Sequence, residues 1–283
     1  MVDVRDVELL KSPEEPPRLE PPPPAGPSRL WIVVGILIVA IAAITYFLAN
    51  RAQRPAPVTT AARTAPPPSS RPLGADAPAV EVPPLDASDP VVRELVKQVT
   101  SNPRIAAWLA TNGLVRSFTV GVQNIAEGST PAARFSVLRP NGAFETTGSG
   151  TLEIAPASYR RYDDLAAAAA SIDPAGAARL YTIVKPRIEE AYRDLGFPDA
   201  AFDRALEQAI VALLQVPAVD RPMRVEPKGI GYAYADPQLE GLTAAQKQLL
   251  RAGPANVRII QASLRQIAQA LGIPPQRLPP PRS

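Results

Sequence analysis

The residue types that most often carry catalysis are unevenly represented in this chain. Its 283 residues include 30 Lys or Arg and 27 Asp or Glu, but no Cys and no His. Without Cys there is no thiolate nucleophile and no disulfide. Without His there is no Ser-His-Asp triad and no imidazole ligand for zinc or haem. Catalysis would therefore fall to carboxylates, and we expect no cofactor, no metal and no enzymatic activity.

Two pairs of adjacent carboxylates are the candidates for acid–base chemistry, Asp163-Asp164 and Glu189-Glu190. Paired carboxylates can hydrolyse glycosidic bonds. Residues at i and i+1 do not face each other on a helix, however, so each acid would need a partner that the fold brings to it. Structural roles on helix surfaces are favoured, and a carboxylate-dependent, glycan-active enzyme remains the alternative.

A denser polar group lies within an otherwise apolar region near the C-terminus. Lys247 and Arg251, four residues apart on one helical face, could bind a phosphate or a glycan carboxylate. The favoured alternative is structural: Arg251 would pair with Asp236 or Glu240 and fasten a loop to the helix. The complete group of candidate ligand-binding or structural residues is Asp236, Glu240, Gln246, Lys247, Arg251 and Asn256.

One segment is predicted to determine where the protein lies in the cell. It runs from Leu30 to Ala49, 20 residues without a charge. A helix of this length spans ~30 Å, which matches the hydrocarbon core of a bilayer. We therefore predict a single-pass transmembrane helix that is retained. The two flanks of this helix carry equal numbers of Lys and Arg, so these counts do not decide its orientation. The short N-terminal tail and the long C-terminal domain favour a cytoplasmic N-terminus and a periplasmic domain.

Proline content divides the rest of the chain, because 17 of its 35 prolines precede residue 85. Such a stretch packs no core and behaves as tail or linker. We predict a proline-rich cytoplasmic tail over 1–29, the span over 30–49, a Pro/Ala/Thr-rich linker over 50–84, a globular domain over 85–272 and a proline-rich C-terminal tail over 273–283.

Within the domain the patterns predict a mainly α-helical (α+β) fold with a small antiparallel sheet. Asp89-Pro90 and Asn102-Pro103 each predict a helix N-cap followed by proline in the first turn. Thr243 and Gln246 predict a capping box. Alternating residues around Gly148-Ser149-Gly150 predict a hairpin, and those over 230–234 predict a third strand. Residues 114–126 fit either a helix or a strand.

Four segments carry a resemblance to a known family: PPLDASDPVV at 83–92, RYDDL at 161–165, EEAYRDLGFP at 189–198 and YADPQLEGLTAAQKQLLRAGPANV at 234–257. They resemble the bacterial domain of unknown function 3014. The resemblance covers nearly all of residues 83–271. It implies a membrane anchor, a proline-rich linker and a domain in the bacterial envelope, and it implies no activity.

The function expected from these features is that of a binding or scaffold module held at the inner membrane. A formal net charge of +3 without a basic cluster, and 5% aromatic residues, exclude nucleic acid as the expected partner. The expected partners are the inner membrane itself and an envelope protein or peptidoglycan.

Overall fold

The computed structural model describes residues 72–131, 139–198 and 201–280. The transmembrane segment predicted at 30–49, the tail before it and most of the predicted linker lie outside these residues. Within the three described ranges, no helix is both long enough and apolar enough to cross a membrane.

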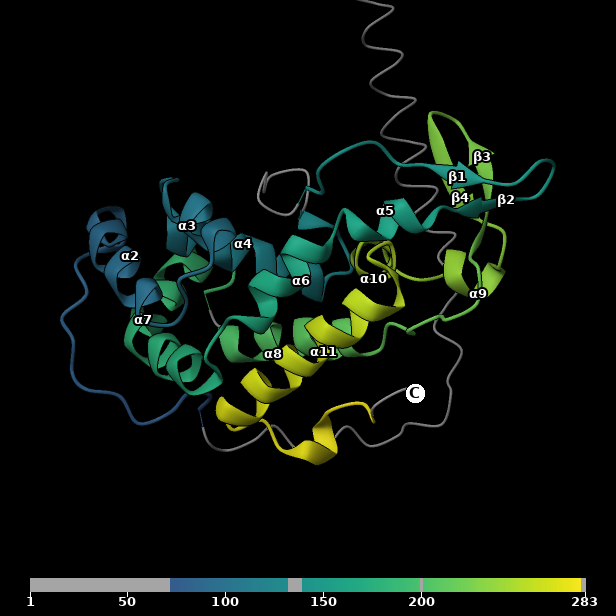
Figure 1. Cartoon of the computed structure of the whole chain (residues 1–283). Coiled ribbons are helices and arrows are strands. Elements are labelled where there is room, and N and C mark those ends of the chain that lie inside the picture. Colours follow the sequence, from purple (N-terminus) through teal and green to yellow (C-terminus); the bar gives the residue numbers. More distant parts are fainter. Residues whose placement is uncertain (1–71, 132–138, 199–200, 281–283) are drawn as a thin grey trace, which may run out of the picture. The chain divides into compact units, whose positions relative to one another are not determined.

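The described residues form a mainly helical fold with one small antiparallel sheet, as predicted (Figure 1). The helices are α2 (Asp89–Lys97), α3 (Pro103–Leu109), α4 (Leu114–Ala126), α5 (Pro156–Arg160), α6 (Asp163–Ala170), α7 (Pro174–Asp194), α8 (Phe202–Leu214), α9 (Pro237–Glu240), α10 (Ala244–Leu250) and α11 (Gly253–Ala270), with short 3-10 turns at Leu85–Ala87 and Pro275–Arg277.

The sheet has the order β1-β2-β3-β4, with every neighbouring pair antiparallel. The predicted hairpin is present, with Thr146 paired to Ile154. The predicted third strand is β4. The strand that sequence analysis missed is β3, whose charged residues and internal Pro227 hide the alternation typical of strands. The strands are β1 (Thr146–Thr147), β2 (Leu152–Ile154), β3 (Arg224–Lys228) and β4 (Gly231–Tyr234).

The ambiguous segment at 114–126 is the helix α4, and its N-terminus corrects one prediction. Ser88, not Asp89, is the N-cap of α2. The Asp89 carboxylate instead accepts hydrogen bonds from the backbone N–H groups of Gly113 at 2.7 Å and Leu114 at 2.9 Å. Asp89 therefore caps the start of α4 from another helix, whereas Asn102 caps α3 locally, as predicted.

Most helices share one apolar core. Helix α4 packs on α7 and α8, and α11 packs on α6, α7 and α8. Phe202 and Leu114 are fully buried at the centre, and Phe202 contacts the rings of Phe118, Tyr181 and Tyr192. A second cluster joins the sheet to α10 and α11 through Ile154, Val225, Leu250 and Val257.

The packed unit extends beyond the domain limits of 85 and 272 that composition predicts. We call residues 72–84 the N-terminal strap. Leu73 is 5% exposed, and its backbone N–H donates to the Asp203 carboxylate at 3.0 Å. The next residue, Gly74, donates to the carbonyl of Leu271 at 3.0 Å. At the other end, Ile273 and Leu278 are buried.

The main core leaves an apolar hollow of about 380 Å³, partly open to solvent, between helices α2, α3, α4, α7, α8 and α11. Its walls include Trp108, Phe118 and Leu264. Almost no polar atom faces it, so it offers no group for acid–base chemistry.

Candidate functional site

The six candidate residues do not form one cluster around a common ligand position. The structure divides them among a loop staple, two helix caps and a corner between helices. Several of these residues combine a contact to a residue close in sequence with a contact to a residue distant in sequence.

The predicted loop staple exists, but Lys247 makes it instead of Arg251. The Lys247 ammonium lies 3.2 Å from Glu240 Oε1 and donates to the Glu240 carbonyl at 3.0 Å. Glu240 also accepts from the backbone N–H of Tyr234 at 3.1 Å, which ties α9 to β4. Arg251 takes part in none of the ion pairs of the described residues. It donates a hydrogen bond to Gln248 Oε1 at 3.5 Å.

We expect Lys247→Ala to lower the free energy of unfolding by about 1–2 kcal/mol, because it removes two charge-assisted contacts of a mostly buried ammonium. The exposed pair Lys97–Glu94 supplies the control, and Lys97→Ala should cost under about 0.5 kcal/mol. Urea denaturation measures both. A larger loss in Arg251→Ala than in Lys247→Ala would contradict this assignment.

The Lys247 effect should also depend on pH. The Tyr234 backbone N–H, followed by Lys247, lowers the pKa of Glu240 below its ordinary value of 4.5. A carboxyl whose folded pKa is lowered stabilises the fold above its unfolded value, and this stability is lost as the pH falls through the folded pKa. The difference between wild type and Lys247→Ala should therefore shrink as the pH falls below 4.5.

Gln246 and Asn256 are buried, and their side chains make hydrogen bonds that stabilise the fold. Gln246 completes the predicted capping box with Thr243 and also donates to the carbonyl of Ala212 at 3.0 Å. The amide of Asn256 donates to the carbonyl of Tyr159 at 3.2 Å and to the carboxylate of Asp163 at 2.8 Å. Asn256 thus holds the turn between α5 and α6 against α11.

Three of the four adjacent acids have separate partners, and the fourth, Asp164, is exposed in the first turn of α6. Asp163 accepts from Asn256, Glu189 accepts from the N–H of Phe202 at the start of α8, and Glu190 pairs with Arg187 at 2.7 Å. No three acidic side chains of the described residues gather closely enough to hold a metal ion.

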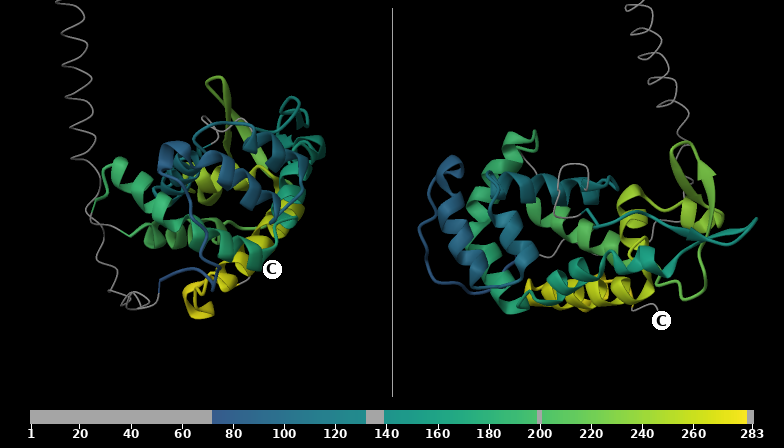
Figure 2. Two further views of the ribbon diagram at one scale, coloured as in Figure 1. Left: turned by 90° about the vertical axis from the view of Figure 1, so that its left-hand side faces the viewer. Right: turned by 45° about the horizontal axis from the view of Figure 1, so that its top comes forward.

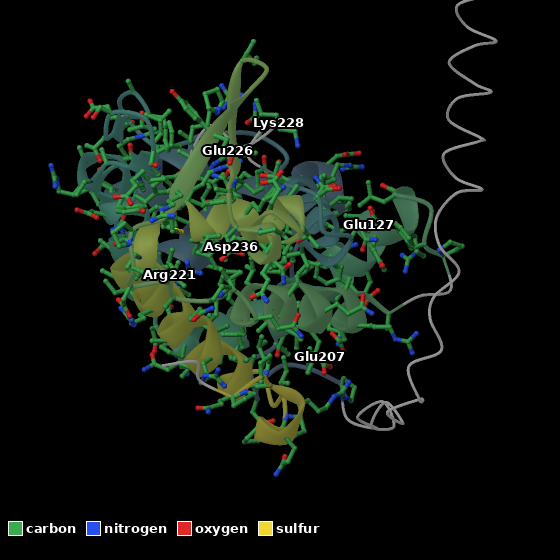
Figure 3. All side chains as sticks on the ribbon, turned by 90° about the vertical axis from the view of Figure 1, so that its right-hand side faces the viewer. Glu127, Glu207, Arg221, Glu226, Lys228 and Asp236 are labelled. Atoms are coloured by element: carbon green, nitrogen blue, oxygen red, sulfur yellow. The ribbon has the colours of Figure 1, made fainter. Side chains whose placement is uncertain are left out.

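A cleft that sequence analysis did not anticipate lies at the base of the sheet. Its volume is about 590 Å³, and two acids and two arginines line it. Arg221 bonds Asp236 at 2.6 Å, and Arg224 lies 3.9 Å from Glu153. Figure 3 shows Arg221 and Asp236 next to each other on this side of the molecule. The remaining lining residues are Pro222, Met223, Ala235 and Leu239.

The Arg221 guanidinium, followed by the N–H of Gln238, lowers the pKa of Asp236. Asp236 also caps α9 by accepting from that N–H at 2.9 Å. A carboxyl with a lowered pKa stays ionised at neutral pH, so it cannot supply a proton as a general acid. The cleft therefore resembles a polar binding surface more than an acid–base site.

The β3–β4 hairpin carries a second feature missed from the sequence. It projects away from the helices in all three views of Figures 1 and 2. Ile230 is fully exposed in its turn. The ring of Tyr232 on β4 is partly exposed and lies 5.2 Å from that of Phe144. The sequence did contain a sign of this feature, because a large apolar residue stands between Gly229 and Gly231, where a turn is expected.

Together these features define a mainly α-helical domain that presents an apolar hairpin tip and a polar cleft. The chain belongs to the family described as "Protein of unknown function (DUF3014)", whose model matches residues 114–268. The match confirms the family and covers the segments at 161–165, 189–198 and 234–257, whereas the segment at 83–92 lies outside the matched residues. No curated protein and no solved structure matches the chain.

Proposed function

We propose that this chain is a non-catalytic binding module, anchored in a bacterial inner membrane by one helix over residues 30–49, with its domain in the periplasm. The uncharged span of 20 residues supports the anchor. The proline-rich stretch that follows it supports a tether that leaves the domain free to reach a partner.

The observation that carries the binding role is the tip of the β3–β4 hairpin, which we define as Phe144, Ile230 and Tyr232. These are three of the six large apolar side chains that the described residues expose. Ile230 and Tyr232 belong to the projecting hairpin, and Phe144, which precedes β1, contacts the Tyr232 ring. Burying an isoleucine of this kind against a partner contributes roughly 1.5–3 kcal/mol.

An envelope protein is the partner that this chemistry favours. Aromatic and apolar side chains form the centres of protein interfaces, and charged side chains surround them. Lys228 and Glu226 flank the tip on β3 and are exposed (Figure 3). The tip thus has the composition of a small interface centre with a polar rim.

A glycan-active enzyme is the second candidate, because Glu153 and Asp236 both line the cleft. Retaining and inverting glycosidases need one carboxylic acid with a raised pKa. Asp236 has a lowered pKa and is occupied as a helix cap. The cleft therefore supports the binding module better than the enzyme.

A photo-crosslinking residue in place of Glu226, in the full-length chain expressed in its native host, would test the binding role. We expect a discrete adduct with an envelope protein. Ile230→Asp should reduce its yield about tenfold or more, because truncated interface centres commonly cost over 1 kcal/mol. Ile259→Asp, at an exposed isoleucine on α11, is the matched control and should leave the adduct intact.

Two results would contradict the proposal. An adduct that survives Ile230→Asp would remove the hairpin tip from the interface. An adduct with a cytoplasmic protein would place the domain on the other side of the membrane.

A further inference from the structure

The turn between α5 and α6 carries polar groups that the proposed binding role does not use. We call Arg161, Tyr162, Tyr234 and Arg251 the arginine corner. Asn256 fixes this turn by bonding Tyr159 and Asp163 on either side of it. Two of the segments that carry the family resemblance, 161–165 and 234–257, supply all four members.

Three hydrogen-bond donors in the corner have no partner. Arg161 Nε and Nη1 and the Tyr234 hydroxyl are buried and lack any hydrogen bond within the part of the chain that the structure describes. The Arg161 Cζ atom lies 5.9 Å from the centre of the Tyr162 ring, a cation–π distance. In that contact the guanidinium interacts with the ring through its positive charge, and the Nε and Nη1 donors of Arg161 still have no acceptor. Unpaired buried donors are rare in folded proteins, and an unpaired charge is costly to bury.

The corner also contains two arginines that take part in no ion pair of the described residues. Arg251 lies close enough to Tyr162 and Tyr234 for its charge to oppose the rise in their pKa values that burial causes. Two acids in the segments that form the corner have other partners. Asp163 accepts from Asn256, and Glu240 is held by Lys247 and Lys228. Two guanidinium groups therefore share this region without an acidic partner of their own.

We propose that the arginine corner binds a phosphate-class oxyanion, whose oxygens accept from Arg161 Nε, Arg161 Nη1 and the Tyr234 hydroxyl, with Arg251 supplying the second positive charge. Guanidinium groups bind phosphate through two parallel N–H donors. A phosphate offers more acceptor oxygens than a carboxylate, which suits two arginines and a phenol. Because burial raises the pKa of Tyr234, its hydroxyl stays protonated and can donate.

This site would also explain why Lys247 and Arg251, on one helical face, have different partners. Lys247 turns to Glu240 and fastens the loop, whereas Arg251 faces the tyrosines of the corner. The oxyanion site shares no residue with the hairpin tip, so the proposal stands whether or not the tip binds a protein.

Titration of the purified full-length chain with sodium phosphate, against sodium chloride at equal ionic strength, tests the site through the thermal midpoint. We expect a saturable rise in phosphate only, since a ligand that binds the folded state raises its stability with concentration. Arg161→Gln should weaken the apparent affinity at least tenfold. Arg160→Gln, at the exposed neighbouring arginine, is the control and should leave the affinity unchanged.

Two further variants separate binding from folding. Arg161→Lys keeps the charge but loses the paired donors, so its affinity should fall as well. Tyr234→Phe removes an unpaired buried hydroxyl, so without phosphate its midpoint should stay equal or rise, while its response to phosphate weakens. The opposite pattern, a lower midpoint without phosphate and an unchanged response to it, would overturn the role of Tyr234.

The source of the phosphate follows from a second titration with glycerophosphoglycerol, a soluble phosphodiester headgroup. Tighter binding than inorganic phosphate assigns the site to a lipid headgroup, and weaker binding assigns it to free phosphate. A wild-type chain that responds to neither probe beyond the chloride control would overturn the proposal. Equal losses in Arg160→Gln and Arg161→Gln would also overturn it, by showing that only net charge matters.

Discussion

Replacing Gly253 with alanine should lower the free energy of unfolding by about 2–5 kcal/mol, a large effect for a single methyl group. Gly253 begins α11 with φ of +82°, a conformation that L side chains rarely adopt. A Cβ atom there would also lie 2.6 Å from Cγ of Tyr159. Strain and overlap therefore add, at the point where the α5–α6 turn meets α11.

Gly272 is the matched control for this substitution. Its φ of +85° is almost the same, but a Cβ atom there would meet nothing within 4 Å. Gly272→Ala should therefore cost only the backbone term, about 1–2 kcal/mol. Urea denaturation of both variants measures the difference, and equal losses would show that Tyr159 yields without cost.

Asp203→Ala should cost about 2–4 kcal/mol, because one carboxylate satisfies three donors. Its oxygens accept from the Tyr181 hydroxyl at 2.5 Å, the Lys185 ammonium at 2.6 Å and the backbone N–H of Leu73 at 3.0 Å. The Lys185 and Asp203 side chains are 22% and 20% exposed. Removal of the carboxylate leaves a mostly buried cation and a buried phenol unpaired and releases the start of the N-terminal strap.

The exposed pair Arg258–Asp220 provides the comparison, since Asp220 is 67% exposed. Asp220→Ala should cost under about 1 kcal/mol. Thermal and urea unfolding measure the stability of both variants, and proteolysis near residues 72–84 reports release of the strap. An Asp203→Ala chain as stable as Asp220→Ala would show that the three bonds contribute little.

Local signals predicted much of the fold. The Thr243–Gln246 capping box and the Asn102 cap are formed by residues two or three apart, so the sequence contains the whole interaction. Sequence patterns also predicted the class of fold, the hairpin at 146–154 and the family. Strand β3 was missed because its charged residues and Pro227 hide the alternation typical of strands, and its pairing with β2 joins residues some 70 positions apart.

The candidate sites depend on contacts between residues that are far apart in the sequence. Asp89 caps α4 across 24 residues, a partner that no local pattern specifies. Arg251 was predicted to bond Asp236 or Glu240 because all three are close in sequence, yet Lys247 reaches Glu240 and Arg221 reaches Asp236. The arginine corner joins Arg161 to residues on β4 and α10 that only the folded chain brings near.

The apolar hollow between the helices affects how a dye-binding assay on this domain is interpreted. The hollow is partly open to solvent, and almost no polar atom faces it. The dye ANS binds exposed apolar surface, and its fluorescence is commonly used to detect partly unfolded states. We expect the folded domain to bind the dye in this hollow. ANS fluorescence alone would therefore not report unfolding of this domain.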